Sequence, residues 1–223
     1  MAKTPAYLEI GRKRVFAGSV DWPGWTRSGR DADAAIDAFL AYAPRYAKVL
    51  HGTGLKFDPP SRASALTLVE RLSGNATTDF GAPDIQPSAD TTPIATKDLE
   101  RFQTILKASW RALDRAADAA EGKVLTKGPR GGGRDLDKIV DHVLGSDESY
   151  LSLLGAKAPK SPPRERAARL RAMIFDTLEA VARDGVPQGP RGGKRWTPRY
   201  FVRRSAWHVL DHAWELEDRT PRR

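Results

Sequence analysis

The chain has 223 residues, of which 40% are hydrophobic and 29% are charged, an ordinary composition for a soluble globular protein. It contains no cysteine, which excludes disulfides, thiolate metal ligands and a cysteine nucleophile, so a reactive site would use histidine and carboxylate side chains. The formal net charge of +9 raises the question of an anionic partner, such as a nucleic acid.

The basic residues are dispersed along the chain. They cluster at residues 11–14, 127–134, 164–171, 191–199 and 222–223. None of these clusters belongs to a helix-turn-helix or zinc-finger pattern, so specific nucleic-acid binding is not expected.

No apolar run approaches the roughly 20 residues that a membrane-spanning helix needs. The start of the chain also lacks the pattern of a signal peptide. We therefore expect no membrane partner and a cytoplasmic location.

The first 95 residues predict a small α/β layer. Residues 6–20 hold two short strands rich in β-branched and aromatic side chains, and a Pro-Gly turn follows at 21–25. A helix is expected over residues 31–50, with an acidic cap at its start and a break or bend at Pro44. Residues 66–72 predict another strand, and residues 75–90 a loop or an irregular strand pair. The lone His51 after the helix is not expected to be a ligand.

The segment WPGWTRSGRDADAAIDAF, Trp22 to Phe39, has a Pro-Gly turn, a returning strand and a helix with an acidic cap. In this order of elements it resembles part of the HicB-like antitoxin domain, over about residues 6–50. The resemblance implies a β-β-β-α layer with an interaction surface. It does not imply toxin binding, since these residues do not carry that property.

From residue 96 the pattern changes to four helices, expected at about 97–122, 135–154, 163–183 and 199–219. Helices joined by short Gly- and Pro-containing loops predict an antiparallel four-helix bundle. The expected fold class is therefore α+β, with a small HicB-like α+β domain at 1–95 and a bundle at 96–223.

Two of the loops look alike, PRGGGR at 129–134 and PRGGKR at 190–195. They precede the second and fourth helices, so an up-down-up-down bundle would place both at one end. There they would form either a basic rim for an anionic substrate or flexible solvated linkers.

The last helix carries His208 and His212, two of only four histidines in the chain. Positions four apart share one face of a helix, so both imidazoles can point to one place. His142 lies in the helix expected at 135–154. We hypothesise that His142, His208 and His212 converge on one divalent metal. The alternative is that two histidines at this spacing simply share a half-buried face, because HxxxH alone is a weak pattern.

Two segments, DKIVDHVLGSDESYLSLLG and RRSAWHVLDHAWELEDR, resemble the second and last helices of the DinB/YfiT-like superfamily of metal-binding bundles. This resemblance covers about residues 97–219. It implies that His142, His208 and His212 are a metal triad for a divalent ion, most often Zn²⁺ or Ni²⁺. Several members are similar to transferases and isomerases that use a low-molecular-weight thiol, namely mycothiol, bacillithiol or glutathione. The resemblance thus implies a metal-dependent enzyme, such as a thiol S-transferase, acting on a small-molecule substrate.

Three neutral imidazoles leave a coordination position open, where a metal can bind water or a thiol and lower its pKa. Candidate acceptors for the second ring nitrogens are Asp147, Glu148 and Glu215. Asp141 and Asp211 point about 100° away from the histidines that follow them, and we expect them in ion pairs instead. The competing hypothesis is a non-catalytic interaction scaffold with a structural metal or none, so enzymatic activity stays open. A homodimer is compatible with either hypothesis.

Overall fold

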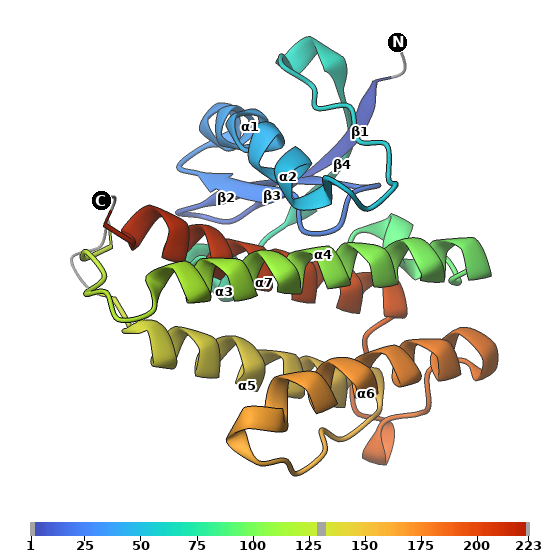
Figure 1. The fold of residues 1–223 in the computed structure, drawn as a ribbon. Helices are drawn as coiled ribbons and strands as arrows, with labels where there is room; N and C mark the ends of the chain where they lie inside the picture. Colours follow the sequence, from blue (N-terminus) through green and yellow to red (C-terminus); the bar gives the residue numbers. More distant parts are fainter. Residues whose placement is uncertain (1–2, 129–132, 222–223) are drawn as a thin grey trace. The chain divides into compact units, whose positions relative to one another are not determined.

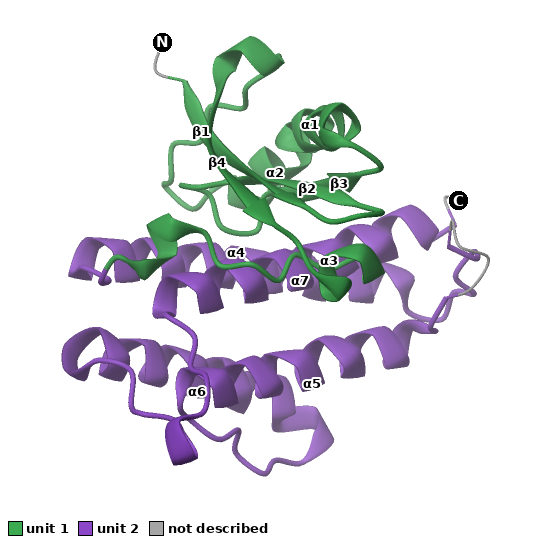
Figure 2. Ribbon diagram, turned by 180° about the vertical axis from the view of Figure 1, so that it is seen from behind, with its two compact units in different colours: residues 1–92 green, residues 93–223 purple. Residues whose placement is uncertain are grey.

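The computed structural model describes residues 3–128 and 133–221, and the chain divides into two compact units (Figure 2). Unit 1 comprises residues 1–92 and unit 2 residues 93–223, a division close to the predicted boundary after residue 95. Strands occur in unit 1 and long helices in unit 2, so the predicted α+β class is confirmed.

Unit 1 is built on a four-stranded mixed sheet in the order β3-β2-β1-β4 (Figure 1). Its strands are β1 (Thr4–Ile10), β2 (Val15–Ser19), β3 (Thr26–Gly29) and β4 (Leu66–Ser73). The first three strands are consecutive and antiparallel, because tight turns join them. β4 pairs with β1 in parallel, a pairing that the sequence did not indicate. Parallel pairing needs a crossover connection, which here contains two helices.

The two crossover helices of unit 1 are α1 (Ala32–Ala41) and α2 (Ala43–Leu50). Asp31 caps α1 by accepting a hydrogen bond from the backbone of Ala34. The expected single helix is interrupted just before Pro44. The core of this unit includes Trp25 stacked on Phe39, with ring centroids 3.8 Å apart.

The segment expected to be a loop or strand pair instead contains a short helix, α3 (Ala76–Phe80), and a 3-10 turn at Ser88–Thr91. Asn75 and Thr78 form a capping box at the start of α3. The buried Glu9 carboxylate of β1 then accepts hydrogen bonds from the Thr78 hydroxyl and from the backbone at Asp84. Glu9, which is far away in sequence, thus holds the segment at 75–90 in place, and local sequence patterns cannot predict such a contact.

Unit 2 contains four long helices that pack side by side (Figure 1). They are α4 (Thr96–Ala120), α5 (Leu136–Leu154), α6 (Pro163–Asp184) and α7 (Pro198–Arg219). A 3-10 turn, Pro190–Gly192, precedes α7. Local signals explain both ends of α5 and the start of α7. Asp135 caps α5, which ends at Gly155 in the left-handed conformation, and Thr197 caps α7 before Pro198.

Hydrogen bonds fix the relative directions of α4, α5 and α7. Asp98 near the start of α4 pairs with Arg199 at the start of α7, so these two helices run in the same direction. Beyond the far end of α4, the backbone of Thr126 donates to that of Arg219 at the end of α7. α5 runs the opposite way, because its last turn accepts a hydrogen bond from the residue two positions before α7 begins.

α6 runs antiparallel to α4 and therefore parallel to α5. Gln103 in the first half of α4 contacts Glu179 in the last turns of α6, and Asp114 contacts Arg171 nearer the start of α6. The order of directions is thus up-down-down-up and not up-down-up-down. Residues 133–134, which precede α5, and residues 190–195, which precede α7, consequently lie at opposite ends of unit 2. The predicted shared end is therefore not found for these described residues; residues 129–132 of the first loop lie outside the described part.

α7 is the most buried helix of unit 2. It is buried without interruption from Tyr200 to Leu210, as a helix with apolar residues on several sides should be. Trp110 of α4 and Trp207 and Trp214 of α7 are all buried as well. Within residues 3–128 and 133–221, no helix has both the length and the apolar character that crossing a membrane requires.

Candidate metal centre

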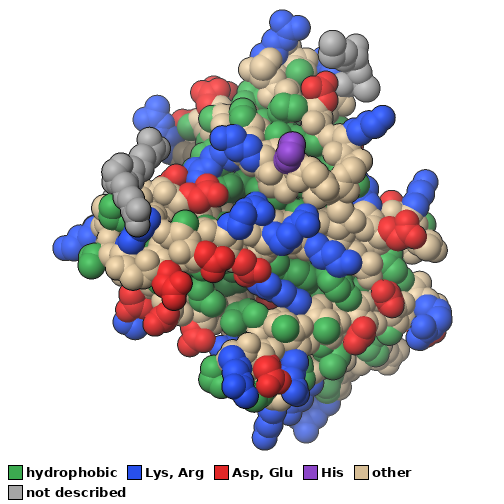
Figure 3. Space-filling model, in the orientation of Figure 1, with side chains coloured by type: hydrophobic (Ala, Val, Ile, Leu, Met, Phe, Trp, Pro, Cys, Tyr) green, Lys and Arg blue, Asp and Glu red, His purple; other side chains and the backbone are tan. Residues whose placement is uncertain are grey.

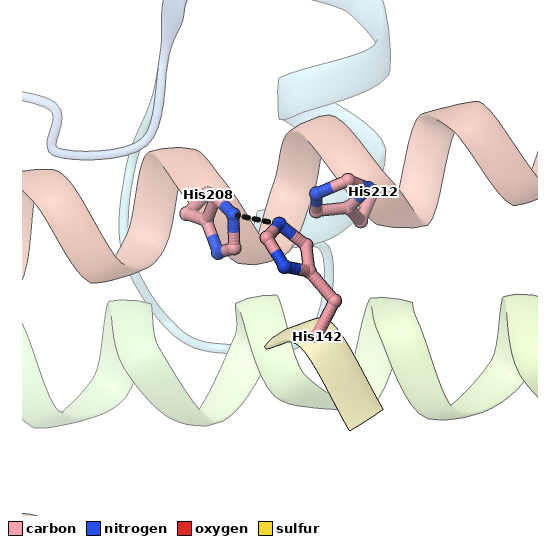
Figure 4. Close-up of side chains that lie close together, drawn as sticks. All are labelled: His142, His208 and His212. Carbon is pink, nitrogen blue, oxygen red and sulfur yellow. Dashed lines mark hydrogen bonds between the residues drawn. The ribbon is translucent and has the colours of Figure 1, made fainter. Parts of the chain in front are cut away.

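The structure brings together all three histidines that the sequence selected. His142 extends from α5, and His208 and His212 extend from adjacent turns of α7, with the three rings directed toward one another (Figure 4). The ring centroids are 4.9 Å apart for His142 and His208, 5.0 Å for His142 and His212, and 4.7 Å for His208 and His212. One potential ligand atom from each ring lies within 4.8 Å of the others, so the group could hold a metal ion.

The closest approach joins Nε2 of His142 to Nε2 of His208, at 3.2 Å. Two nitrogens bound at about 2.05 Å to one tetrahedral zinc ion are about 3.3 Å apart, so this pair already has the spacing of two ligands. Only one of these facing nitrogens can carry a proton in this contact, and the other presents a lone pair.

Hydrogen bonds to backbone carbonyls at both ends of the helix pair hold the rings in register. At one end Arg219 of α7 donates through Nη2 to the carbonyl of Arg134, just before α5. At the other end the backbone of Trp196, before α7, donates to Leu153 of α5. Because α5 and α7 are anchored at both ends, His142 faces the middle of the HxxxH segment.

Glu215 supports one of the rings directly. Nδ1 of His212 lies 2.7 Å from Oε2 of Glu215, and Nη1 of Arg219 donates to the other carboxylate oxygen at 2.6 Å. A carboxylate that accepts from Nδ1 fixes the tautomer in which Nε2 is free to bind a metal. The hydrogen bond from His212 also holds the pKa of Glu215 below its usual value.

Burial keeps the other two imidazoles in their neutral form. Desolvation is the main cause that lowers the pKa of His142, and it lowers the pKa of the more deeply buried His208 well below its usual value. The nearby charges of Arg134 and Arg204 act in the same direction on His208. These cations oppose a bound metal, but they also favour the unprotonated rings that a metal requires. Nδ1 of His208 is buried and has no hydrogen-bond partner among the described residues.

The other carboxylates named from the sequence have different partners. Asp147 is fully buried on α5 and accepts hydrogen bonds from Ser205 and Trp110, and its burial raises its pKa to about 6. Glu148 binds Arg166 instead of a histidine. Asp141 also binds Arg166, which confirms the expected ion pair between helices.

Two residues of this region were missed in the sequence. Arg219 orients Glu215, and the i, i+4 spacing of these two charges could have indicated the pair. Arg204 lies one helical turn before His208, yet nothing in its spacing predicts its burial. His51 is exposed at the end of α2 in unit 1 and is not part of the histidine group, as expected.

Comparison of the chain with protein-family models, with curated protein sequences and with solved structures gave no match. The function must therefore be inferred from the site itself.

Proposed function

We propose that this protein is a divalent-metal-dependent enzyme of the DinB/YfiT-like type, in which His142, His208 and His212 bind the metal. The observation that carries the proposal is the convergence of three imidazoles from two helices, with two ring nitrogens 3.2 Å apart. We further propose zinc or nickel as the metal and transfer of a low-molecular-weight thiol as the reaction. The resemblance of α5 and α7 to that superfamily supports these two finer statements.

The donor set suits this chemistry. Three neutral nitrogen ligands leave the full double charge of a divalent ion and at least one open position, where a bound thiol or water loses its proton more easily. The chain lacks cysteine, so a reactive thiolate must come from a small molecule. His142 is only half-buried, which leaves the cluster accessible from its side.

The surrounding residues would orient the ligands. Glu215 keeps the His212 proton on Nδ1, and Arg219 holds Glu215 in place through its own ion pair. Burial of His208 prevents its protonation near neutral pH. These contacts prepare the rings for a metal without a change of helix packing.

Metal analysis of untagged protein tests the proposal. We expect about one zinc or nickel ion per chain in the wild type, and loss of that ion in His142→Ala and in His212→Gln. His51→Ala is the matched control, because this histidine is exposed in unit 1 and should leave the metal content unchanged. Metal that persists in both cluster variants would refute the site.

Thiol activation is tested separately in cobalt-substituted protein. Coordination of glutathione, mycothiol or bacillithiol should produce a sulfur-to-cobalt charge-transfer band. Conjugation of the same thiol with an aryl chloride should release chloride, as the new carbon–sulfur bond replaces the carbon–chlorine bond and the thiol proton passes to solvent. Bound metal with neither signal would instead support the scaffold hypothesis, in which the metal is structural.

A specific interface with nucleic acid is not part of this proposal. On the face drawn in Figure 3, the Lys and Arg side chains are dispersed among Asp and Glu side chains. Ion pairs with carboxylates also use several of the arginines in unit 2. Carboxylates beside these basic side chains weaken their attraction for a phosphate backbone.

A further inference from the structure

Arg204 is a buried charge with no carboxylate partner among residues 3–128 and 133–221. Its side chain is on α7, one turn before His208, and the residue is only 7% exposed. Both Nε and Nη1 are buried, and neither has a hydrogen-bond partner among the described residues. A guanidinium in this state is costly, because it has lost water without gaining acceptors.

Other arginines on the helices of unit 2 differ from Arg204. Each of the following has a carboxylate partner: Arg166 with Glu148, Arg171 with Asp114, Arg199 with Asp98 and Arg219 with Glu215. Arg171 is the closest comparison, because it also lies over a tryptophan ring, that of Trp110, at 5.4 Å. Thus each of these four arginines has a carboxylate partner, whereas Arg204 has none in the described part of the chain.

Two aromatic rings beside the histidine cluster flank Arg204. The guanidinium carbon lies 5.2 Å from the ring centre of Tyr150 on α5 and 4.7 Å from that of Trp207. The same two rings are 5.9 Å and 6.0 Å from the ring of His208. Tyr150 is only half-buried, so this side of Arg204 lies near solvent. Aromatic faces stabilise the cation in part, but they cannot accept its in-plane N–H groups as a carboxylate does.

We propose that Arg204 binds an anion beside the histidine cluster, and that its ligand is a small molecule bearing a carboxylate. A single planar guanidinium between aromatic rings matches one planar, singly charged group. A phosphate dianion would need further donors, and among the described residues Arg204 is the cation that lies over these two rings. The identity of the ligand rests on the proposed function: the carboxylate belongs to the thiol or to its electrophile, whose reactive end lies at the cluster.

The test uses the full-length, metal-free protein with ¹⁵N-labelled arginine. The Nε–H resonance of Arg204 is assigned by its absence in Arg204→Gln. Propionate is titrated at constant ionic strength, with propionamide as the neutral isostere and inorganic phosphate as the competing anion. We expect a saturable shift of the Arg204 resonance with propionate alone. The Arg171 resonance should stay constant, because Asp114 already binds both Nη atoms of that guanidinium.

The variants give a second measurement. Arg204→Gln should weaken propionate binding by on the order of 10- to 100-fold, whereas Arg171→Gln should leave it unchanged. Arg204→Lys keeps the positive charge and the packing of the aliphatic part of the side chain, but it loses the planar, two-pronged guanidinium. It takes the place of Arg204→Gln if the glutamine variant does not fold. Equal shifts with propionamide, stronger binding of phosphate, or unchanged affinity in the Arg204 variants would each overturn the inference.

Zinc titration of the same samples separates this inference from the proposed function. Propionate binding without any zinc binding would refute the proposed metalloenzyme and support the anion site. Zinc binding with no response of Arg204 to propionate would refute the anion site alone.

Discussion

Replacing Glu215 with glutamine should weaken metal binding while preserving the fold. Glu215 accepts from Nδ1 of His212 at 2.7 Å, so the unbound Nε2 of that ring presents a lone pair. A glutamine amide can donate to Nδ1 and thereby favour the opposite tautomer, whose Nε2 carries a proton and cannot ligate. Arg219 keeps its hydrogen bonds to the carbonyls of Thr126 and Arg134, so its buried charge still has acceptors in the variant.

The size of the effect follows from burial. Loss of a partner that orients a metal-binding histidine typically costs about 10- to 100-fold in affinity. The Glu215 side chain is 31% exposed, so solvent screens part of its interaction with His212. We therefore expect the lower part of the range, about 10- to 30-fold, or about 1.4 to 2 kcal/mol.

The assay is competition for zinc against a fluorescent chelator, with untagged protein. Asp141→Asn is the matched control, because this carboxylate precedes a cluster histidine in sequence but pairs with Arg166 and is 76% exposed. The control should bind zinc as the wild type does. Unchanged affinity in Glu215→Gln would show that the carboxylate does not act on His212, and equal losses in both variants would point to the fold instead.

Three further outcomes are expected. Zinc affinity should be nearly constant above about pH 6.5 and fall at lower pH. The reason is that burial lowers the pKa of His142 and His208, so protons compete with the metal only in acid. Repeating the zinc competition across pH measures this dependence. Asp147→Asn should be more stable than the wild type above pH 6. Folding raises the pKa of this carboxyl from 3.8 to about 6, so its ionised form destabilises the folded wild type by up to about 3 kcal/mol. That difference should shrink as pH falls from 6 to 4, and urea unfolding of both proteins that shows a pH-independent gap would contradict it. Ile139→Ala should lower the free energy of unfolding by about 2–5 kcal/mol, because the side chain is fully buried on α5; a loss below 1 kcal/mol in the same urea assay would show that this core position is loosely packed.

Local chemistry explains why the helices of unit 2 could be predicted. Asp135, Thr197 and Gly155 are capping residues that act within one turn of the chain, so the ends of α5 and α7 were near their predicted positions. The HxxxH spacing likewise depends only on the helical repeat, which places His208 and His212 on one face.

Contacts between distant segments decided the rest. The sequence placed three carboxylates near the histidines, but only packing of α5 against α7 determined that Glu215 binds a ring while Asp147 binds Ser205. Likewise, the direction of α6 depends on ion pairs with α4 and α5, and no periodicity within α6 encodes it.

By itself the sequence determined the helices, the α+β class and the three histidines, because helical repeat and end-capping act over a few residues. Only the tertiary structure decided which groups face those histidines, that Arg204 is buried without a carboxylate, and that β4 lies parallel to β1. The physical reason is that burial and pairing of a polar side chain depend on atoms supplied by another element, often many residues away.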